Sequence, residues 1–185
     1  ILFEKNKKHF DKIHSILPDV LSKIASEKKI RQFIHISALG VENAIDSEYA
    51  KSKLNGEKNV RKNFKNAVIL KPSIVYSIDD NFSTNFMTLL SRLPIMPLYY
   101  KGATKFAPIH VSDLTQIIYK IISEDKQNLT IECVGPEELT FKEILQKLLK
   151  AIKKKRLLLP MPTPVAKITA ALLGVLPKPL LTLDQ

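Results

Sequence analysis

The chain has 185 residues, of which 45% are hydrophobic, and a formal net charge of +11. This length and apolar content allow one substantial core and exclude an intrinsically disordered chain. The single cysteine, Cys133, excludes a disulfide framework and fits a reducing compartment. The basic residues are spread over predicted helical faces without a recognition motif, so we expect no specific nucleic acid as a partner. An anionic cofactor or membrane surface accounts for the charge equally well.

The sequence shows no signal peptide and no segment that predicts a transmembrane helix. Its longest apolar segment, residues 165–176, contains Lys167 and is bounded by prolines. The chain begins without methionine, on three apolar residues (ILF) that are typical of the end of a strand. We therefore expect an N-terminally truncated fragment that leaves an apolar edge or face uncovered.

The first half of the chain predicts alternating helices and strands. Apolar residues recur at helical spacing from Phe10 to Ile24, and Pro18 should kink or restart this amphipathic helix. The nearly continuous apolar run 30–36 is typical of a parallel strand that is covered on both faces. A helix over 49–63 and a strand over 67–70 follow. This alternation predicts an α/β fold with a parallel sheet.

The second half predicts further short elements and then an apolar tail punctuated by prolines. Residues 140–143 (TFKE) match a capping box, which opens a helix. Ser112 or Asp113 can cap the helix before it. The other predicted elements are a helix over 82–93, a strand over 107–111, a helix that ends near residue 123 and a strand over 129–134.

Tyr49 and Lys53 lie one helical turn apart in the predicted helix 49–63. An ammonium beside a phenol favours the phenolate and lowers the tyrosine pKa toward the range of general acid/base catalysis. The pair follows a predicted strand that ends at Ser37, and ligands of open α/β sheets bind at this edge. Ser37 can orient a substrate oxygen or cap a turn. The spacing alone also fits a solvated helical face.

Two common kinds of site are missing from the sequence. The five glycines do not form a G-x-G-x-x-G motif, so the chain contains no recognisable pyrophosphate loop. The four histidines show no metal-ligand spacing, so we expect no metal site, and His35 is interpreted as a core histidine within a strand.

Four stretches resemble, in order and spacing, the motifs of a known family. They are residues 33–37 (FIHIS), 49–57 (YAKSKLNGE), 70–76 (LKPSIVY) and 108–114 (PIHVSDL). Together they are similar to the extended and atypical short-chain dehydrogenases, the NAD-dependent epimerase/dehydratase family. The resemblance covers nearly the whole chain. It implies the C-terminal part of a Rossmann-type parallel sheet with a small, mainly helical substrate-side lobe.

The resemblance also implies how the chain is divided. Residues 1–76 and 107–135 would form the C-terminal part of a Rossmann domain, whose first strands and glycine loop would precede residue 1. Residues 77–106 and 136–185 would form the smaller lobe. Since the glycine loop is missing, we do not expect residues 1–185 alone to bind NADPH measurably.

The family's functional residues have counterparts here, with one departure. Tyr49 and Lys53 match the family's catalytic pair, with Lys53 on the nicotinamide ribose, and Ser37 is the third catalytic candidate. In catalytic members a Ser or Thr usually follows the position of Ser37, but this chain has Ala38. Ala38 cannot hydrogen-bond a substrate oxygen, which argues against oxidoreductase turnover. The implied cofactor contacts are Tyr49, Lys53, Pro72, Ser73, Ile74 and Val75.

One branch of this family has further similarities. Residues 35–40 (HISALG), residues 79–82 (DDNF) and the proline-rich tail are most similar to the dehydrogenase-like accessory subunits of respiratory complex I and their bacterial relatives. That group is associated with tightly held NADP(H) and a supporting role. The resemblance implies NADP or NAD as the dinucleotide, complex I subunits as partners, and little or no turnover.

Other functions and locations stay open at this point. An NAD(P)-dependent reductase, epimerase or dehydratase, acting on a sugar nucleotide or another carbonyl or hydroxyl substrate, would use Tyr49 as its acid/base. A binding module without a cofactor is a third hypothesis. We expect a cytoplasmic protein with at most peripheral membrane contact, at the inner face of a respiratory membrane through the apolar tail 157–181. That tail also fits a small lobe packed on its own domain.

Overall fold

The computed structural model describes residues 8–44 and 46–161, and the chain divides into two compact units. The first unit contains the described residues up to Ser73 together with Ser112–Cys133. The second unit contains Ile74–Val111 and the described residues from Val134 onward. The apolar tail beyond residue 161, predicted as a docking segment, lies outside the described residues.

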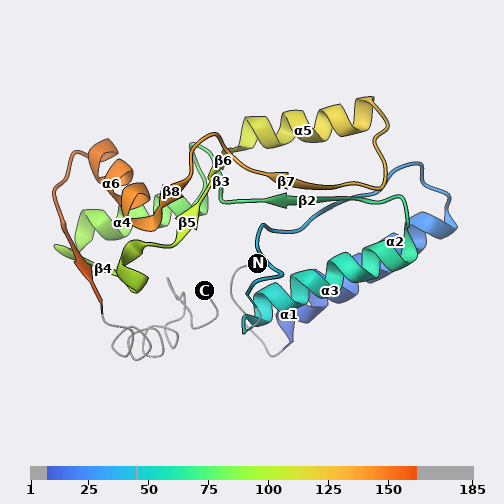
Figure 1. Cartoon of the computed structure of the whole chain (residues 1–185), viewed down its shortest axis with the longest axis horizontal. Helices are drawn as coiled ribbons and strands as arrows, with labels where there is room; N and C mark the ends of the chain where they lie inside the picture. The colour runs from blue at the N-terminus through green and yellow to red at the C-terminus, as the bar shows by residue number, and fades with distance from the viewer. Residues whose placement is uncertain (1–7, 45, 162–185) are drawn as a thin grey trace. The chain divides into compact units, whose positions relative to one another are not determined.

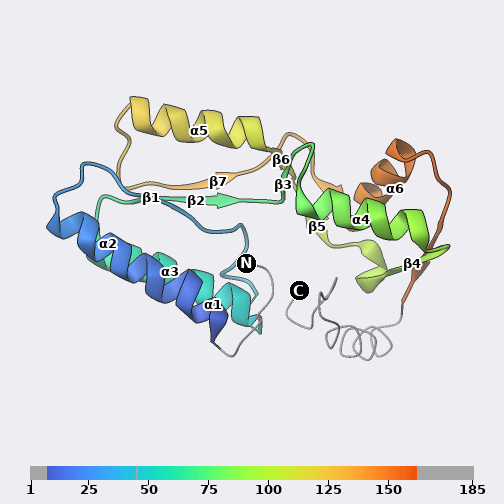
Figure 2. The same ribbon diagram turned by 180° about the vertical axis from the view of Figure 1, so that it is seen from behind.

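The first unit is built around a three-stranded parallel sheet. Its strands are β1 (Ile34–Ile36), β2 (Val68–Pro72) and β7 (Thr130–Cys133), in the order β1-β2-β7. Helices α2 (Leu17–Glu27) and α3 (Glu48–Asn63) lie on one face of the sheet and α5 (Val111–Ser123) on the other (Figure 1, Figure 2). Every residue of β2 is buried, as expected for a central parallel strand. The predicted α/β fold with a parallel sheet is confirmed.

Three predicted boundaries were wrong, each for a local reason. The predicted strand at Ile30 begins only at Ile34, because the Ile30 amide donates to the Ala25 carbonyl and closes the preceding helix. Strand β2 continues beyond Leu70 through Pro72, whose carbonyl accepts a hydrogen bond from the Leu39 amide. Helix α5 begins at Val111, before the predicted caps and directly after strand β6 (Ile109–His110).

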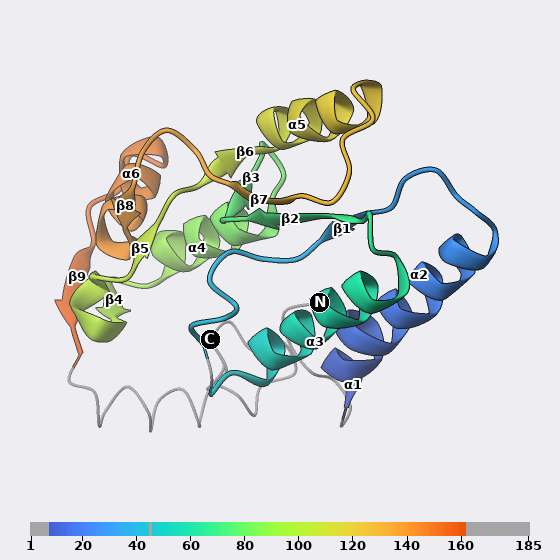
Figure 3. The same ribbon diagram turned by 45° about the vertical axis from the view of Figure 1, so that its right-hand side comes forward.

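A widened helical turn takes up the proline in the first helical segment. The segment consists of α1 (His9–Asp11), the π-helical turn η1 (Lys12–Ile16) and α2 (Leu17–Glu27), and it lies beside α3 (Glu48–Asn63) (Figure 3). Pro18 has no amide hydrogen to donate to the His14 carbonyl four residues earlier. That carbonyl lies instead against Gly56, where a Cβ atom would be 1.9 Å from its oxygen. Only glycine allows this approach.

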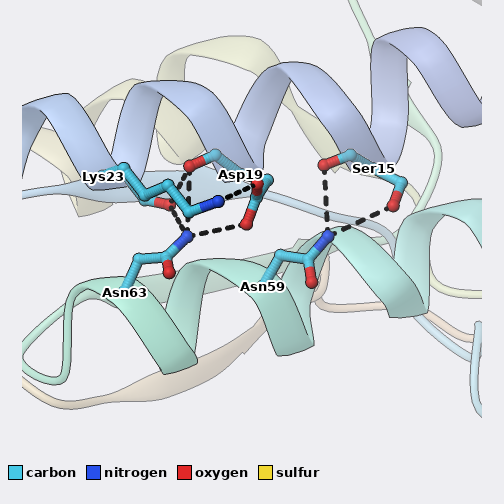
Figure 4. Close-up of polar contacts among 6 residues, drawn as sticks. Ser15, Asp19, Lys23, Asn59 and Asn63 are labelled. Atoms are coloured by element: carbon cyan, nitrogen blue, oxygen red, sulfur yellow. Dashed lines mark hydrogen bonds and ion pairs between the residues drawn. The ribbon is translucent and has the colours of Figure 1, made fainter.

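Helix α2 turns polar groups toward the neighbouring helix and leaves much of its apolar face exposed, the reverse of the usual arrangement. Polar groups join α2 and the preceding turn η1 to α3: the Asn63 amide donates to Asp19 Oδ1 on α2 over 2.8 Å, and the Asn59 amide donates to Ser15 Oγ on η1 over 3.3 Å (Figure 4). The apolar residues point away from α3 and are 44–49% exposed. They are Ile16, Leu17, Val20, Leu21 and Ile24. We call these five residues the apolar stripe; the uncovered edge or face predicted where the chain begins stays a prediction, because residues 1–7 lie outside the described residues.

Arg61 on α3 forms hydrogen bonds at the N-terminal ends of two strands, β2 and β7. Its guanidinium donates to the Ala67 carbonyl, just before β2, over 2.6 Å. It also donates to the Leu129 carbonyl and the Thr130 hydroxyl, where β7 begins, over 2.7 and 2.8 Å. A planar guanidinium presents several donors in a fixed fork, which suits this task. Arg61 therefore holds β2 and β7 at one end of the sheet.

The second unit has its own core between two helices and short strand pairs. Helices α4 (Asn81–Arg92) and α6 (Phe141–Ala151) pack together, and Thr140 and Glu143 form the predicted capping box of α6. Buried core residues include Leu90, Leu98 and Leu145. The strand pairs are β3 (Val75–Tyr76) with β6 (Ile109–His110), β4 (Ile95–Leu98) with β9 (Leu157–Pro160), and β5 (Lys105–Phe106) with β8 (Leu139–Thr140); a 3₁₀ turn, η2, spans Tyr99–Gly102.

Replacing Gly56 tests the close approach of the two helical segments. We expect Gly56→Ala to lower the free energy of unfolding by roughly 1–3 kcal/mol, because the methyl group meets a backbone oxygen that cannot rotate away. Urea denaturation followed by circular dichroism measures the change. Asn55→Ala, at an exposed position of the same helix, is the matched control and should be neutral or slightly stabilising. Equal stability of Gly56→Ala and the unsubstituted chain would contradict the contact.

Replacing Arg61 tests the link between β2 and β7. We expect Arg61→Met to lower the free energy of unfolding by about 1–3 kcal/mol, because carbonyl groups lose a charged donor. Hydrogen exchange should accelerate most at the amides of β2 and β7. Lys58→Met removes an exposed charge from the same helix and should change neither quantity. If hydrogen exchange accelerates throughout the chain, or does not accelerate at all, Arg61 does not hold β2 and β7 locally.

Candidate functional site

The candidate site lies at the carboxyl ends of β1 and β2. The Ser37 amide donates to the Leu70 carbonyl over 2.7 Å, and the Leu39 amide donates to the Pro72 carbonyl over 2.9 Å. These bonds hold the segment after β1 against the end of β2, so Ser37 and Pro72 share one edge of the sheet. Ligands of open α/β sheets bind at such an edge. The structure therefore brings two predicted site residues together.

Helix α3 carries Tyr49 and Lys53 toward this edge. Its N-cap is Ser47, whose hydroxyl accepts a hydrogen bond from the Ala50 amide over 3.1 Å. The Lys53 ammonium lies 6.0 Å from the centre of the Tyr49 ring and donates to the Ile36 carbonyl over 3.3 Å. Within the part of the chain that the structure describes, this is the one hydrogen bond that Lys53 makes. An ammonium has three donors, so two remain for a ligand.

Burial decides the protonation behaviour of this pair. The pKa of Lys53 is lowered because burial disfavours the ammonium, an effect that the charge of Glu57 opposes. The pKa of Tyr49 is raised by burial. The predicted lowering of the Tyr49 pKa by Lys53 is thus wrong, because the rings of Phe10 and His14 pack on the phenol at centroid distances of 5.7 and 5.2 Å. Tyr49 is a neutral phenol that can donate a hydrogen bond.

The buried His14 and the half-buried His35 adjoin the pair. The Ser52 hydroxyl donates to the Tyr49 carbonyl over 2.7 Å, so His14 Nδ1–H donates to Ser52 Oγ over 3.0 Å. This assignment leaves His14 Nε2 as an acceptor, and among the described residues neither this atom nor His35 Nε2 has a hydrogen-bond partner. Burial first, and the charge of Lys53 next, lower the pKa of both His14 and His35 to about 4. Both rings are therefore neutral at pH 7.

A chain of buried polar groups runs behind Lys53. Ser37 Oγ donates to Glu57 Oε1 over 2.5 Å, and Glu57 Oε2 forms an ion pair with Lys71 Nζ at 3.2 Å. Lys71 also pairs with Glu42 at 3.3 Å. Ser37, Glu57 and Lys71 are only 3%, 7% and 8% exposed. Burial opposes the charge of Lys71, but the two carboxylates outweigh it and raise its pKa.

This chain bears on the role predicted for Ser37. Its hydroxyl hydrogen is committed to Glu57, so orienting a substrate oxygen would require that bond to break. The sequence interpretation missed Glu57, Lys71 and His14. Glu57 follows Lys53 by four residues on the same helical face, and Lys71 interrupts an apolar strand, so both carried a recognisable signal. A single histidine such as His14 carried none.

The other predicted cofactor contacts lie in two different units. Pro72 ends β2, and the Ser73 amide donates to the Cys133 carbonyl over 3.0 Å, so both belong to the first unit. Ile74 and Val75 belong to the second unit, where the Ile74 carbonyl accepts from the Ile109 amide over 2.9 Å. Contact of any of these residues with a nicotinamide ring stays a prediction.

The described residues contain neither a cluster of metal ligands nor a membrane-spanning helix. In residues 8–44 and 46–161, no three His, Cys, Asp or Glu side chains gather as metal ligands would. Nor does any helix in these ranges have the length and apolarity needed to cross a bilayer. Cys133 is buried, and burial raises the pKa of its thiol.

Comparison with known proteins connects this geometry to named relatives. The family model "RmlD substrate binding domain" matches residues 4–172. The mitochondrial "NADH dehydrogenase [ubiquinone] 1 alpha subcomplex subunit 9" of Arabidopsis thaliana is 24% identical over 172 residues, which are 91% of this chain and 43% of the relative. Its Mus musculus counterpart is 25% identical over 180 residues, 95% of this chain and 47% of the relative. The chain thus spans about half the length of these curated relatives.

A solved structure shows the same fold. The dTDP-4-dehydrorhamnose reductase of Bacillus anthracis, in complex with NADP, superposes with a TM-score of 0.70 at 19% identity. The match covers 86% of this chain and 62% of that protein. Similar solved structures with bound NAD include a dTDP-glucose 4,6-dehydratase of Streptomyces venezuelae. The chain therefore has the fold of Rossmann-type NAD(P)-binding enzymes.

Acidification should weaken the first unit through its buried histidines. The unfolded chain binds protons near pH 6.5, whereas folded His14 and His35 bind them only near pH 4. Stability is therefore full above pH 6.5 and is lost as pH falls toward 4, by up to about 3 kcal/mol for His14. Urea midpoints measured between pH 7.5 and pH 4 should show this loss, and His14→Gln should flatten the profile. If the stability of His14→Gln falls with pH as steeply as that of the unsubstituted chain, His14 is not a source of the loss.

Proposed function

The chain belongs to the RmlD substrate binding domain family, within the short-chain-dehydrogenase-like epimerase/dehydratase superfamily, and on this basis we propose a dinucleotide-binding protein of NADH:ubiquinone oxidoreductase with little or no turnover. The observation that carries the proposal is the match over 91–95% of the chain to subunits of the mitochondrial NADH dehydrogenase. The chain joins that assembly as an accessory or assembly subunit. It is cytoplasmic or attached at the inner face of the respiratory membrane.

The site fits the ribose end of NADP or NAD. Lys53 has two unused donors next to the carboxyl end of β1, which suits ribose hydroxyls. Tyr49 would donate from its neutral hydroxyl to the same ribose. Pro72, Ser73, Ile74 and Val75 would approach the nicotinamide. When bound, the dinucleotide supplies hydride-transfer chemistry.

Three features favour retention of the dinucleotide over its use. Ala38 stands where catalytic members carry a hydroxyl, and Ser37, next to it, gives its hydrogen to Glu57. The raised pKa of Tyr49 makes the phenolate unfavourable, so Tyr49 is a poor base. A site that binds ribose without a substrate-orienting hydroxyl or an activated base has little means of turnover.

A reductase, epimerase or dehydratase acting on a sugar nucleotide or another carbonyl substrate is the second candidate. The retained Tyr49 and Lys53 favour it, since both catalytic-pair positions are filled and lie on one helical face. In that case Tyr49 would act mainly as a proton donor, which a raised pKa permits.

Copurification and bound-cofactor analysis test the proposal on the full-length gene product. We expect the tagged protein to copurify with NADH dehydrogenase subunits from its own membranes and to release NADP(H) or NAD(H) on denaturation. Lys53→Met should weaken dinucleotide binding at least tenfold, about 1.4 kcal/mol, whereas Lys51→Met, at an exposed position two residues away, should not.

Two results would count against the proposal. A protein that is never recovered with NADH dehydrogenase subunits would remove the assembly role. A carbonyl or sugar-nucleotide turnover that Tyr49→Phe abolishes, with dinucleotide binding unchanged, would favour the enzyme instead.

A further inference from the structure

We propose that Glu57 is a positioning residue for Lys53: Ser37 and Lys71 hold its carboxylate at the carboxyl end of β1, and the carboxylate keeps the Lys53 ammonium charged and in place. The dinucleotide-binding part of this inference rests on the proposed function. The placement of Glu57 and its effect on Lys53 do not. Glu57 touches no substrate or cofactor in this scheme and acts only through Lys53.

The geometry anchors both side chains to neighbouring backbone positions. Lys53 and Glu57 are four residues apart on α3, so they lie on the same helical face. The Lys53 ammonium donates to the carbonyl of Ile36, and Glu57 accepts from the hydroxyl of Ser37, the next residue. The end of β1 therefore anchors the ammonium at one residue and the carboxylate at the next.

The charge of Glu57 acts on two ammonium groups, Lys71 through an ion pair and Lys53 through space. Lys71 has two carboxylate partners, Glu57 from inside and Glu42, whose side chain is 42% exposed, from the solvent side. Of these two carboxylates, Glu57 is the one whose charge also acts on Lys53. Without Glu57, Lys71 would keep only Glu42, and Lys53 would lose the carboxylate that supports its charge. A buried ammonium then loses its proton more readily.

Other titratable groups around Lys53 do not offer a replacement. His14 on η1 and His35 on β1 are neutral at pH 7, and a proton on either would repel the ammonium. Tyr49 on α3 is a neutral phenol. Among the groups that influence the pKa of Lys53, Glu57 is the carboxylate that supports its charge. The inference also gives a role to Lys71, which the proposed function leaves unexplained.

Titration of Lys53 in the full-length gene product tests the inference directly. Lysine side chains labelled with ¹³C at Cε report the protonation of each ammonium by NMR, and Lys53→Arg assigns the signal. Glu57→Gln preserves the shape of the side chain and its hydrogen bond from Ser37. We expect it to lower the Lys53 midpoint by about one pH unit or more. Glu48→Gln, at an exposed position on α3, is the matched control and should leave the midpoint unchanged.

Dinucleotide affinity supplies the second readout. In Glu57→Gln, NADPH affinity should fall at least threefold at pH 8. As the pH is raised, the loss of affinity should begin at a lower pH than in the unsubstituted protein, because the Lys53 ammonium loses its proton earlier. Ser37→Ala should shift the Lys53 midpoint in the same direction, and Ser37→Thr, which keeps the hydroxyl, should restore it. Ser37→Ala also serves as the test if Glu57→Gln does not fold.

The outcomes separate this inference from the proposed function. In one outcome, both Glu57→Gln and Ser37→Ala lower the melting temperature but leave the Lys53 midpoint unchanged. This outcome would overturn the inference and leave Glu57 a purely structural residue. If the unsubstituted protein binds no dinucleotide, the proposed function fails. A shifted Lys53 midpoint would in that case still support the positioning of Lys53 by Glu57.

Discussion

The contact between the His14 carbonyl and Gly56 is the constraint on which the candidate site depends. Pro18 leaves this carbonyl without its helical donor, and the missing side chain of Gly56 gives it room against α3. The same approach places the rings of Phe10 and His14 on Tyr49. The burial of the phenol, and hence its protonation, thus depends on a proline and a glycine that are not among the rings packed on it.

Local signals predicted the elements of the fold well. Helical spacing located α3, and the capping box of α6 was visible in four consecutive residues. The start of β1 was misplaced because Ile30 is apolar like a strand residue, yet its amide closes the preceding helix. Hydrophobicity alone does not distinguish a cap residue from a strand residue. Only the direction of one backbone hydrogen bond does so.

The site was predicted less completely, because its electrostatics come from contacts distant in sequence. Spacing located Lys53 beside the end of β1, and the Ile36 carbonyl confirms that neighbourhood. The sign of the Tyr49 pKa shift depends on rings from another helical segment, which no pattern around Tyr49 reports. Lys71 inside an apolar strand could have revealed the buried chain, since a buried ammonium requires a carboxylate partner.

The reversed faces of α2 also determine which substitutions this unit can accept. In an ordinary amphipathic helix, the apolar positions are intolerant and the polar positions are free. Here Leu17 and Leu21 are largely exposed, so polar residues there would cost the unit little of its own packing. Asn59, Asn63 and Asp19 make the contacts between helices, so apolar residues there would remove them. Saturation mutagenesis of this unit should therefore find the polar positions between the helices less tolerant of substitution than the apolar stripe. If the apolar stripe is intolerant instead, another surface covers it in the cell.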